Sequence, residues 1–218
     1  NTQKISCHLW IKGNENFKTS TIDDCTQWNA DIKYINRNEF YNEELARAYA
    51  DENNLLYIPM GGHDEIGINS VTDYLSEMNL SFYDYLICAV GTGTTMMGAA
   101  YIKNNFNTII GIDVGTNDVK IDQAINLLAK ELPHKKLVLL HQYSFGGFAK
   151  HDTQLIDFMN TLYTQYQIPT DIVYTGKLFY AVKNLAQKEF FRPSGKVLII
   201  HSGGLQGNRS LPKEVLRF

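Results

Sequence analysis

A continuously apolar segment that runs into a glycine-rich turn constrains the fold of this chain more than any other part of it. Residues 85–90 read YLICAV, residues 91–95 read GTGTT, and the small-residue segment MMGAA follows. An apolar run without polar alternation is typical of a strand that is covered on both faces, as in a parallel sheet. The segment therefore predicts a buried strand, a tight turn and a helix in succession.

The same order of strand and helix recurs along the chain and predicts an α/β fold with a mainly parallel sheet flanked by helices. Apolar runs predict strands over Lys4–Ile11, Asp31–Ile35, Leu55–Ile58, Tyr85–Val90, Thr108–Ile112, Leu137–His141, Ile172–Tyr174 and Val197–His201. Helical spacing of apolar residues predicts helices over Glu43–Asn53, Ser70–Asn79, Met96–Asn104, Ile121–Glu131, Asp152–Gln167 and Leu178–Glu189, with Asp152 as an N-cap.

Charge and residue usage exclude several classes of function for the 218 residues. The net charge of −3 argues against binding to nucleic acid or to an anionic membrane, which both need clustered positive charge. No apolar run approaches the ~20 residues of a membrane span. The three cysteines, Cys7, Cys25 and Cys88, share no CxxC spacing, and the six histidines show no HxxxH pattern, so we expect no metal site and a cytoplasmic protein.

The turn at residues 91–95 has the chemistry of a phosphate site. The first amides of a helix lack intrahelical acceptors and carry partial positive charge, and glycines allow a phosphate to approach the backbone. The candidate ligands are Gly91, Thr92, Gly93, Thr94 and Thr95. A nicotinamide dinucleotide is an alternative, because Asp113 ends the next strand, although Met96 replaces the third glycine of that fingerprint.

Four further segments place glycines, aromatic residues or hydroxyls at loops. They are YIPMGGHDEIG at 57–67, YSFGGFAK at 143–150, DIVYTGK at 171–177 and VLIIHSGGLQG at 197–207. Ligands of open α/β sheets bind beyond the carboxyl ends of strands, so Ser202 could contact a bound ring there. Tyr174 could stack on a planar ligand or act in proton transfer, although a lone tyrosine is more often a core residue.

In order, these segments resemble the 1-aminocyclopropane-1-carboxylate deaminase / D-cysteine desulfhydrase family from about Tyr57 to Gly207. The resemblance implies the pyridoxal-phosphate dependent, tryptophan-synthase-β-like fold (fold type II), lacking its N-terminal part. It implies two domains, with residues 1–56 as the latter part of the smaller cofactor-covering domain and residues 57–218 as the large cofactor-binding domain. The VYTGK and HSGGLQG segments carry the resemblance most specifically.

The resemblance also implies roles for individual residues. Residues 91–95 would hold the phosphate of pyridoxal 5'-phosphate, Ser202 would pair with the pyridine nitrogen, and Tyr174 would be a catalytic and substrate-binding residue. The loop at 143–150 often carries a substrate-facing tyrosine in relatives. This chain offers Tyr143, Phe145 and Phe148 there, and Phe145 is our candidate for that place. Deaminases of the family tend to carry glutamate where this chain has Thr175 and an aliphatic residue in place of Ser202, so the pattern resembles the desulfhydrase branch.

The family's Schiff-base lysine lies in an N-terminal Gly-Asn-Lys segment, which these 218 residues do not contain. The resemblance makes Lys177 structural, and we expect an N-terminal portion to precede Asn1. The expected function of the complete protein is a lyase or deaminase that releases a 2-oxo acid and ammonia from a small amino acid, as a homodimer. The alternatives are an NAD-dependent Rossmann oxidoreductase and a non-catalytic remnant of the fold.

Overall fold

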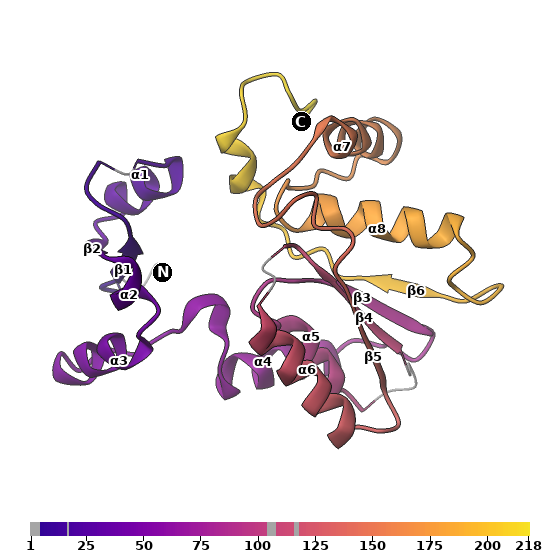
Figure 1. Cartoon of the computed structure of the whole chain (residues 1–218), viewed down its shortest axis with the longest axis horizontal. Helices are drawn as coiled ribbons and strands as arrows, with labels where there is room; N and C mark the ends of the chain where they lie inside the picture. Colours follow the sequence, from indigo (N-terminus) through magenta and orange to yellow (C-terminus); the bar gives the residue numbers. More distant parts are fainter. Residues whose placement is uncertain (1–4, 17, 104–107, 116–117) are drawn as a thin grey trace. The chain divides into compact units, whose positions relative to one another are not determined.

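The computed structural model of the chain describes residues 5–16, 18–103, 108–115 and 118–218 (Figure 1). The start of the strand predicted from Lys4 and the end of the helix predicted to Asn104 lie outside these residues. The chain divides into two compact units, Asn1–Pro59 and Met60–Phe218. Each unit is described by itself below.

The first unit is built on two parallel strands, β1 (His8–Lys12) and β2 (Asp31–Ile35), in which His8 pairs with Asp31. Its helices are α1 (Ser20–Gln27), α2 (Arg37–Phe40) and α3 (Glu43–Glu52). An Asn–Glu capping box at residues 36–39 sets the start of α2, because each side chain satisfies a backbone amide of the first turn.

The second unit contains a four-stranded parallel sheet in the order β5-β4-β3-β6. The strands are β3 (Tyr85–Val90), β4 (Thr108–Asp113), β5 (Lys136–Leu140) and β6 (Val197–Ile199). Because all four strands run in the same direction, their carboxyl ends lie at one edge of the sheet.

Helices cover both faces of this sheet (Figure 1). The elements are η1 (Met60–Gly62), α4 (Glu65–Ser76), α5 (Thr94–Tyr101), α6 (Val119–Glu131), α7 (Thr153–Tyr166), α8 (Thr175–Gln187) and η2 (Leu205–Ser210). Leu86, Cys88 and Val90 pack in the core with α5 and α6, whereas Ile87 packs on the other face with α8. This alternation explains why the strand sequence is apolar without interruption.

The sequence-based prediction of the α/β class is confirmed, and most elements lie within a few residues of their predicted ranges. Two predicted strands are wrong: Leu55–Ile58 has no regular structure and Ile172–Tyr174 forms a turn before α8. The helices α1 and α2 were not predicted. Asp152 does cap α7, since its carboxylate accepts the Leu155 amide at 2.9 Å.

Candidate functional site

The segments singled out in the sequence meet at the carboxyl edge of the second unit's sheet. Strand β3 ends in the GTGTT turn, and its neighbour β6 leads into His201 and Ser202. Ile87 pairs with Ile199, and the Ile200 amide donates to the Ile87 carbonyl at 2.9 Å. Three residues beyond this pair, the first strand reaches Val90 and the segment after the second strand reaches Ser202. The two glycine turns therefore follow adjacent parallel strands.

The GTGTT turn presents the amino end of α5. Gly93 is the N-cap and no side chain caps this end, so the first amides of the helix have no acceptor from the helix itself. The helix dipole adds partial positive charge at the same place. This donor set fits the phosphate of a cofactor, which is anionic and needs several hydrogen-bond donors.

The threonine hydroxyls of the turn divide into two groups. The Thr94 hydroxyl donates to the Gly61 carbonyl at 3.0 Å, and its oxygen lies 3.1 Å from the Thr92 hydroxyl and 3.3 Å from His63 Nδ1. A Cβ at Gly61, where φ is +67°, would lie 2.4 Å from Thr92 Oγ1. Thr92 and Thr94 thus hold the η1 segment against the turn, whereas half-buried Thr95 has no such contact among the described residues.

Tyr174 lies beside the GTGTT turn. A Cβ at Gly91 would meet Cε1 of the tyrosine ring at 3.1 Å and its hydroxyl oxygen at 3.6 Å. The backbone of Tyr174 is fixed by the buried carboxylate of Asp171, which accepts the amides of Val173, Tyr174 and Thr175 at 2.8–3.0 Å. Burial, and secondarily the charge of Asp171, raises the pKa of Tyr174 above its ordinary value. The phenol is therefore a proton donor rather than a base near neutral pH.

The aromatic residues of the 143–150 loop face different neighbours. Phe148 is half exposed and meets the Tyr174 ring edge-on, with centroids 5.9 Å apart. Phe145 packs edge-on against Tyr180 of α8, with centroids 4.9 Å apart, in the cluster beneath α7. The structure therefore brings Phe148, and not Phe145, into contact with Tyr174. Sequence reasoning named this residue but had no signal to choose it, because a loop without periodicity does not reveal which ring points where.

His201 holds the turn that carries Ser202, a role that the sequence did not indicate. Its Nε2 atom lies 2.8 Å from the Pro169 carbonyl, and the Gly203 amide donates to Nδ1 at 3.1 Å. A carbonyl can only accept and an amide can only donate, so Nε2 is the donor and Nδ1 the acceptor in these contacts. Ser202 itself is exposed at this edge.

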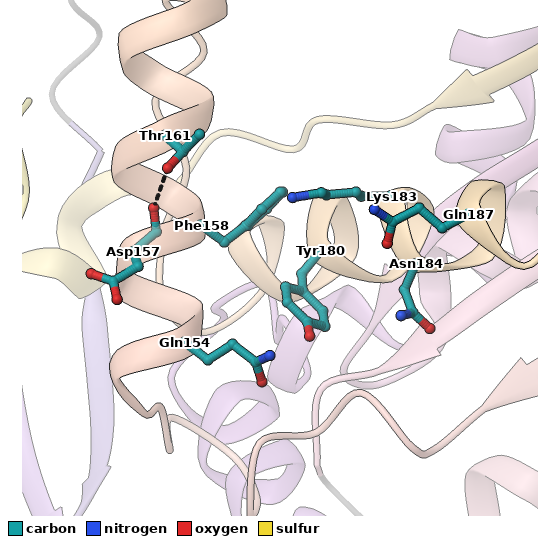
Figure 2. A pocket seen from close by; sticks show the side chains of 8 residues that line it. All are labelled: Gln154, Asp157, Phe158, Thr161, Tyr180, Lys183, Asn184 and Gln187. Atoms are coloured by element: carbon teal, nitrogen blue, oxygen red, sulfur yellow. Dashed lines mark hydrogen bonds between the residues drawn. The ribbon is translucent and has the colours of Figure 1, made fainter.

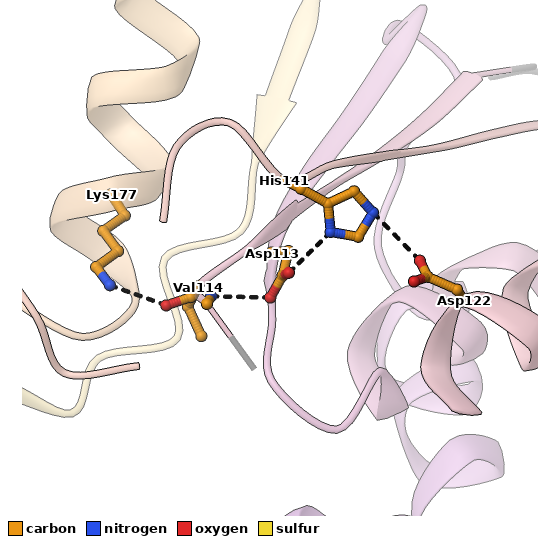
Figure 3. A network of polar contacts seen from close by, with 6 residues as sticks. Asp113, Val114, Asp122, His141 and Lys177 are labelled. Carbon is orange, nitrogen blue, oxygen red and sulfur yellow. Dashed lines mark hydrogen bonds and ion pairs between the residues drawn. The ribbon is translucent and has the colours of Figure 1, made fainter. Parts of the chain in front are cut away.

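Asp113, the acid that raised the possibility of a dinucleotide site, is buried in an internal network (Figure 3). One of its oxygens accepts the Gly115 amide at 2.8 Å and the other lies 2.8 Å from His141 Nδ1. His141 Nε2 lies 3.2 Å from Asp122 of α6. The Asp113 carboxylate at the end of β4 is therefore linked through His141, which follows β5, to Asp122 of α6. These contacts give Asp113 a structural role.

Lys177, in the first turn of α8, has a fully buried side chain. Its ammonium group donates to the carbonyls of Val114, Ser144 and Gly147 at 2.7–2.8 Å, and Figure 3 shows the contact with Val114 next to Asp113. Burial lowers the pKa of Lys177 to about 8, against the opposing charges of Asp113 and Asp171. The lysine thus connects three segments at the edge where the candidate residues meet.

A separate cavity of about 340 Å³ lies between α7 and α8 (Figure 2). None of the residues predicted from sequence for the site lines it; its lining residues are Gln154, Asp157, Phe158, Thr161, Tyr180, Lys183, Asn184 and Gln187. Within the described ranges, no group of three or more histidine, cysteine or acidic residues could hold a metal ion. In the same part of the chain, no helix has the length and apolar character needed to cross a bilayer.

Comparison with known proteins shows which proteins this chain is similar to. The sequence profile of the family described as pyridoxal-phosphate dependent enzyme matches residues 3–203. The chain is 30% identical over 217 residues to the protein named "Putative 1-aminocyclopropane-1-carboxylate deaminase" of Pyrococcus horikoshii, with 91% of this chain and 66% of the relative covered. It is 28% identical over 142 residues to the 1-aminocyclopropane-1-carboxylate deaminase of Rhizobium radiobacter, with 59% and 42% covered.

Solved structures agree with the sequence comparison. A crystal structure described as an ACC deaminase homologue superposes with a TM-score of 0.71 at 26% identity and covers 94% of this chain and 67% of its own. The processed form of threonine deaminase isoform 2 from Solanum lycopersicum has a TM-score of 0.54 at 15% identity, which shows a shared fold. The chain spans about two thirds of the length of the Pyrococcus horikoshii relative and less of the rhizobial one.

Proposed function

The chain belongs to the family of pyridoxal-phosphate dependent enzymes, and we propose that the carboxyl edge of its second sheet is the cofactor site. Residues 91–95 hold the phosphate and Ser202 pairs with the pyridine nitrogen. The observation that carries this assignment is the adjacency of β3 and β6, whose turns flank the same edge. When bound, the cofactor supplies an electron sink for carbanion chemistry at the amino-acid substrate.

The residues of the turn bind the phosphate in different ways. The amides of the first turn of α5 and the Thr95 hydroxyl donate to the phosphate oxygens. Thr92 and Thr94 act indirectly, because their hydroxyls are engaged with each other and with the Gly61 carbonyl. Their role is to hold η1 against the turn and so keep the amides oriented toward the ligand.

Tyr174 is the candidate acid of the site. Its raised pKa keeps the phenol protonated at neutral pH, so that it can deliver a proton or a hydrogen bond to a leaving group. The Asp171 carboxylate fixes the backbone from which the ring projects. Phe148 covers one edge of the ring, which favours Phe148 over Phe145 as the aromatic wall toward the substrate.

Ser202 gives the pyridine nitrogen a neutral hydroxyl partner. A hydroxyl leaves that nitrogen largely unprotonated, whereas a carboxylate partner would hold it protonated and make the ring a deeper electron sink. This choice favours reactions in which a good leaving group departs after proton loss.

The substrate class follows from the same residues. We propose a small amino acid from which the complete enzyme releases a 2-oxo acid and ammonia. Thr175 is buried and its hydroxyl donates to Asp171 at 2.7 Å, so this position offers the substrate no carboxylate. Thr175 and Ser202 support a D-cysteine desulfhydrase type of reaction, in which a thiol leaves. The names of the relatives support the opening of the aminocyclopropane ring as the second candidate.

The organisation of the complete protein is part of the proposal. Residues 1–56 form the latter part of the smaller cofactor-covering domain, which is supported by the compact first unit with its own parallel strands. Residues 57–218 form the large cofactor-binding domain. A homodimer in the cytoplasm is the expected setting, and the Schiff-base lysine is expected in a segment preceding Asn1.

A binding experiment on this chain tests the phosphate assignment. Pyridoxal 5'-phosphate and pyridoxal differ only in the phosphate, so we expect the first to bind and the second to bind at least tenfold more weakly. Replacing Thr95 with valine removes a hydroxyl donor and should weaken only the phosphorylated ligand. Equal affinities for the two compounds, measured by equilibrium dialysis, would contradict the assignment. Loss of cofactor binding even when the upstream segment is supplied would favour a non-catalytic remnant.

A further inference from the structure

Lys177 joins two loops of the sheet edge through backbone carbonyls. Val114 belongs to the turn that follows β4, and Ser144 and Gly147 belong to the loop that follows β5. An ammonium group has three N–H donors, and each of the three carbonyls takes one of them. The lysine side chain is fully buried; its bond to Val114 is buried, and its bonds to Ser144 and Gly147 are partly buried.

The two loops are in direct backbone contact at the same place. The Phe148 amide donates to the Gly115 carbonyl at 3.0 Å. A Cβ at Gly115, where φ is +100°, would lie 2.4 Å from the carbonyl carbon of Gly147. The two loops are therefore packed closely together. The Ser144 and Gly147 carbonyls also accept the amides of Gly147 and Lys150, at 3.2 and 3.1 Å. Removal of the ammonium group would thus take one of two donors from each of these carbonyls and would also take the Lys177 donor from the Val114 carbonyl, which is costly in a buried place.

We propose that Lys177 is a positioning residue whose ammonium group fixes the 144–148 loop on the 113–115 turn and so sets Phe148 against Tyr174. Tyr174 is the N-cap of α8, and Lys177 lies in the first turn of this helix. The helix therefore positions the Tyr174 ring directly, and it positions the Phe148 ring through Lys177 and the 144–148 loop. We call the three hydrogen bonds from Lys177 to the carbonyls of the two loops the clamp. The importance of the ring pair for the reaction rests on the proposed function, but the existence of the clamp does not.

The charge state of Lys177 agrees with this role. Burial lowers its pKa to about 8, while Asp113 and Asp171 oppose the shift. At pH 7 the ammonium form still predominates, and all three carbonyls have a donor. We therefore place the test at pH 7.

The first experiment compares backbone hydrogen exchange in the full chain and in Lys177→Ala, without cofactor. We expect the Phe148 amide and the peptides covering 113–115 and 144–148 to exchange about tenfold faster in the variant, with α7 and β3 unchanged. Lys183→Ala is the matched control, because Lys183 lies in the same helix and contacts the Phe158 ring instead of the loops. It should leave both peptides unchanged.

Chemical rescue separates the donor role from general loss of packing. n-Propylammonium matches the four atoms that the alanine substitution removes, so at pH 7 it should restore protection of the two peptides. Tetramethylammonium at the same concentration carries the charge but has no N–H donor and should not restore it. Unchanged exchange in Lys177→Ala, or failure of n-propylammonium to restore protection, overturns the proposal.

If Lys177→Ala does not fold, Lys177→Met, which keeps the apolar stem, takes its place. Faster exchange confined to the two peptides then supports the clamp, and uniform faster exchange overturns it. Because no cofactor is present, these outcomes are independent of phosphate binding at residues 91–95. Loss of binding with the clamp intact would contradict the proposed function instead.

Discussion

The ring of Tyr174 lies against the backbone of Gly91, so close that a Cβ at residue 91 would be 3.1 Å from Cε1 of the ring. One residue opens the turn after β3 and the other caps α8. Their proximity joins the candidate phosphate turn to the candidate acid in one site.

Gly91→Ala should displace the Tyr174 ring without removing its hydroxyl. The contact at 3.1 Å is tighter than ordinary van der Waals distance, so the ring must move by a few tenths of an ångström. Tyr174→Phe keeps the ring and removes the hydroxyl, so in the complete enzyme we expect kcat to fall about 10²-fold, the size of a lost general acid. Gly91→Ala keeps the hydroxyl and should lower kcat by a smaller factor. A wild-type rate in Gly91→Ala would show that the position of the ring is unimportant.

Gly61→Ala should weaken pyridoxal 5'-phosphate binding by disturbing Thr92 and Thr94. The substitution adds strain of about 1–3 kcal/mol at a positive φ and places a Cβ 2.4 Å from Thr92 Oγ1. Gly62→Ala is a matched control, since its φ is +59° but a Cβ there meets nothing within 4 Å. Equal binding losses in the two variants, measured by equilibrium dialysis, would mean that backbone strain and not the threonine contact matters.

Ser202→Glu should change the electronic state of the cofactor ring. A carboxylate at this place favours a protonated pyridine nitrogen, so we expect a shift of the cofactor absorbance and slower turnover in the complete enzyme. Ser202→Thr keeps a hydroxyl and should retain both. Spectra and rates that do not change in Ser202→Glu would remove Ser202 from the ring-nitrogen role.

His201→Phe should loosen the turn that carries Ser202. The variant keeps a ring beside Phe179 but loses both hydrogen bonds, each worth about 0.5–1.5 kcal/mol. We expect faster hydrogen exchange at the Gly203 amide and a cofactor absorbance closer to that of a Ser202 variant. His134→Phe, at an exposed loop, serves as control. An unaltered Gly203 exchange rate would refute the role of His201.

Asp84→Asn should destabilise the second unit more at pH 7 than at pH 3. The Asp84 carboxylate accepts the Lys196 amide at 2.8 Å and contacts Arg192, and these partners lower its pKa. A lowered pKa in the folded state contributes stability above about pH 4, the ordinary value for aspartate, and loses it as the pH falls through the folded value. Urea denaturation of both proteins from pH 7 down to pH 3 measures the difference between their free energies of unfolding. A difference that does not change with pH would contradict the prediction.

The fold was predictable because its signals are local and repeated. The apolar runs of β3, β4 and β5 have the length and composition of strands covered on two faces, and the capping aspartate of α7 follows from its place before a helical apolar pattern. Leu55–Ile58 has the same composition, but no strand within the described residues pairs with it. Ile172–Tyr174 is held as a turn by the Asp171 carboxylate, which no periodicity reveals.

The site was predictable only in part, for a related reason. The glycine turn and Ser202 follow strands, so parallel pairing brings them to one edge. The roles of Lys177 and His201 depend on carbonyls far away in the sequence, such as Val114 and Pro169. The partition between Phe145 and Phe148 depends on the backbone path of an aperiodic loop. Such contacts arise from tertiary packing and have no short-range signature.

The cysteine in the middle of β3 has a practical consequence for probing this protein. Burial raises the pKa of Cys88 to about 12, so its thiol is unreactive in the native state. Cys7 is exposed and Cys25 is half-buried, and both belong to the first unit. A maleimide dye or spin label applied to the unmodified chain would therefore mark the first unit alone. Its signal would report on the motion of the first unit without a contribution from a label on the second.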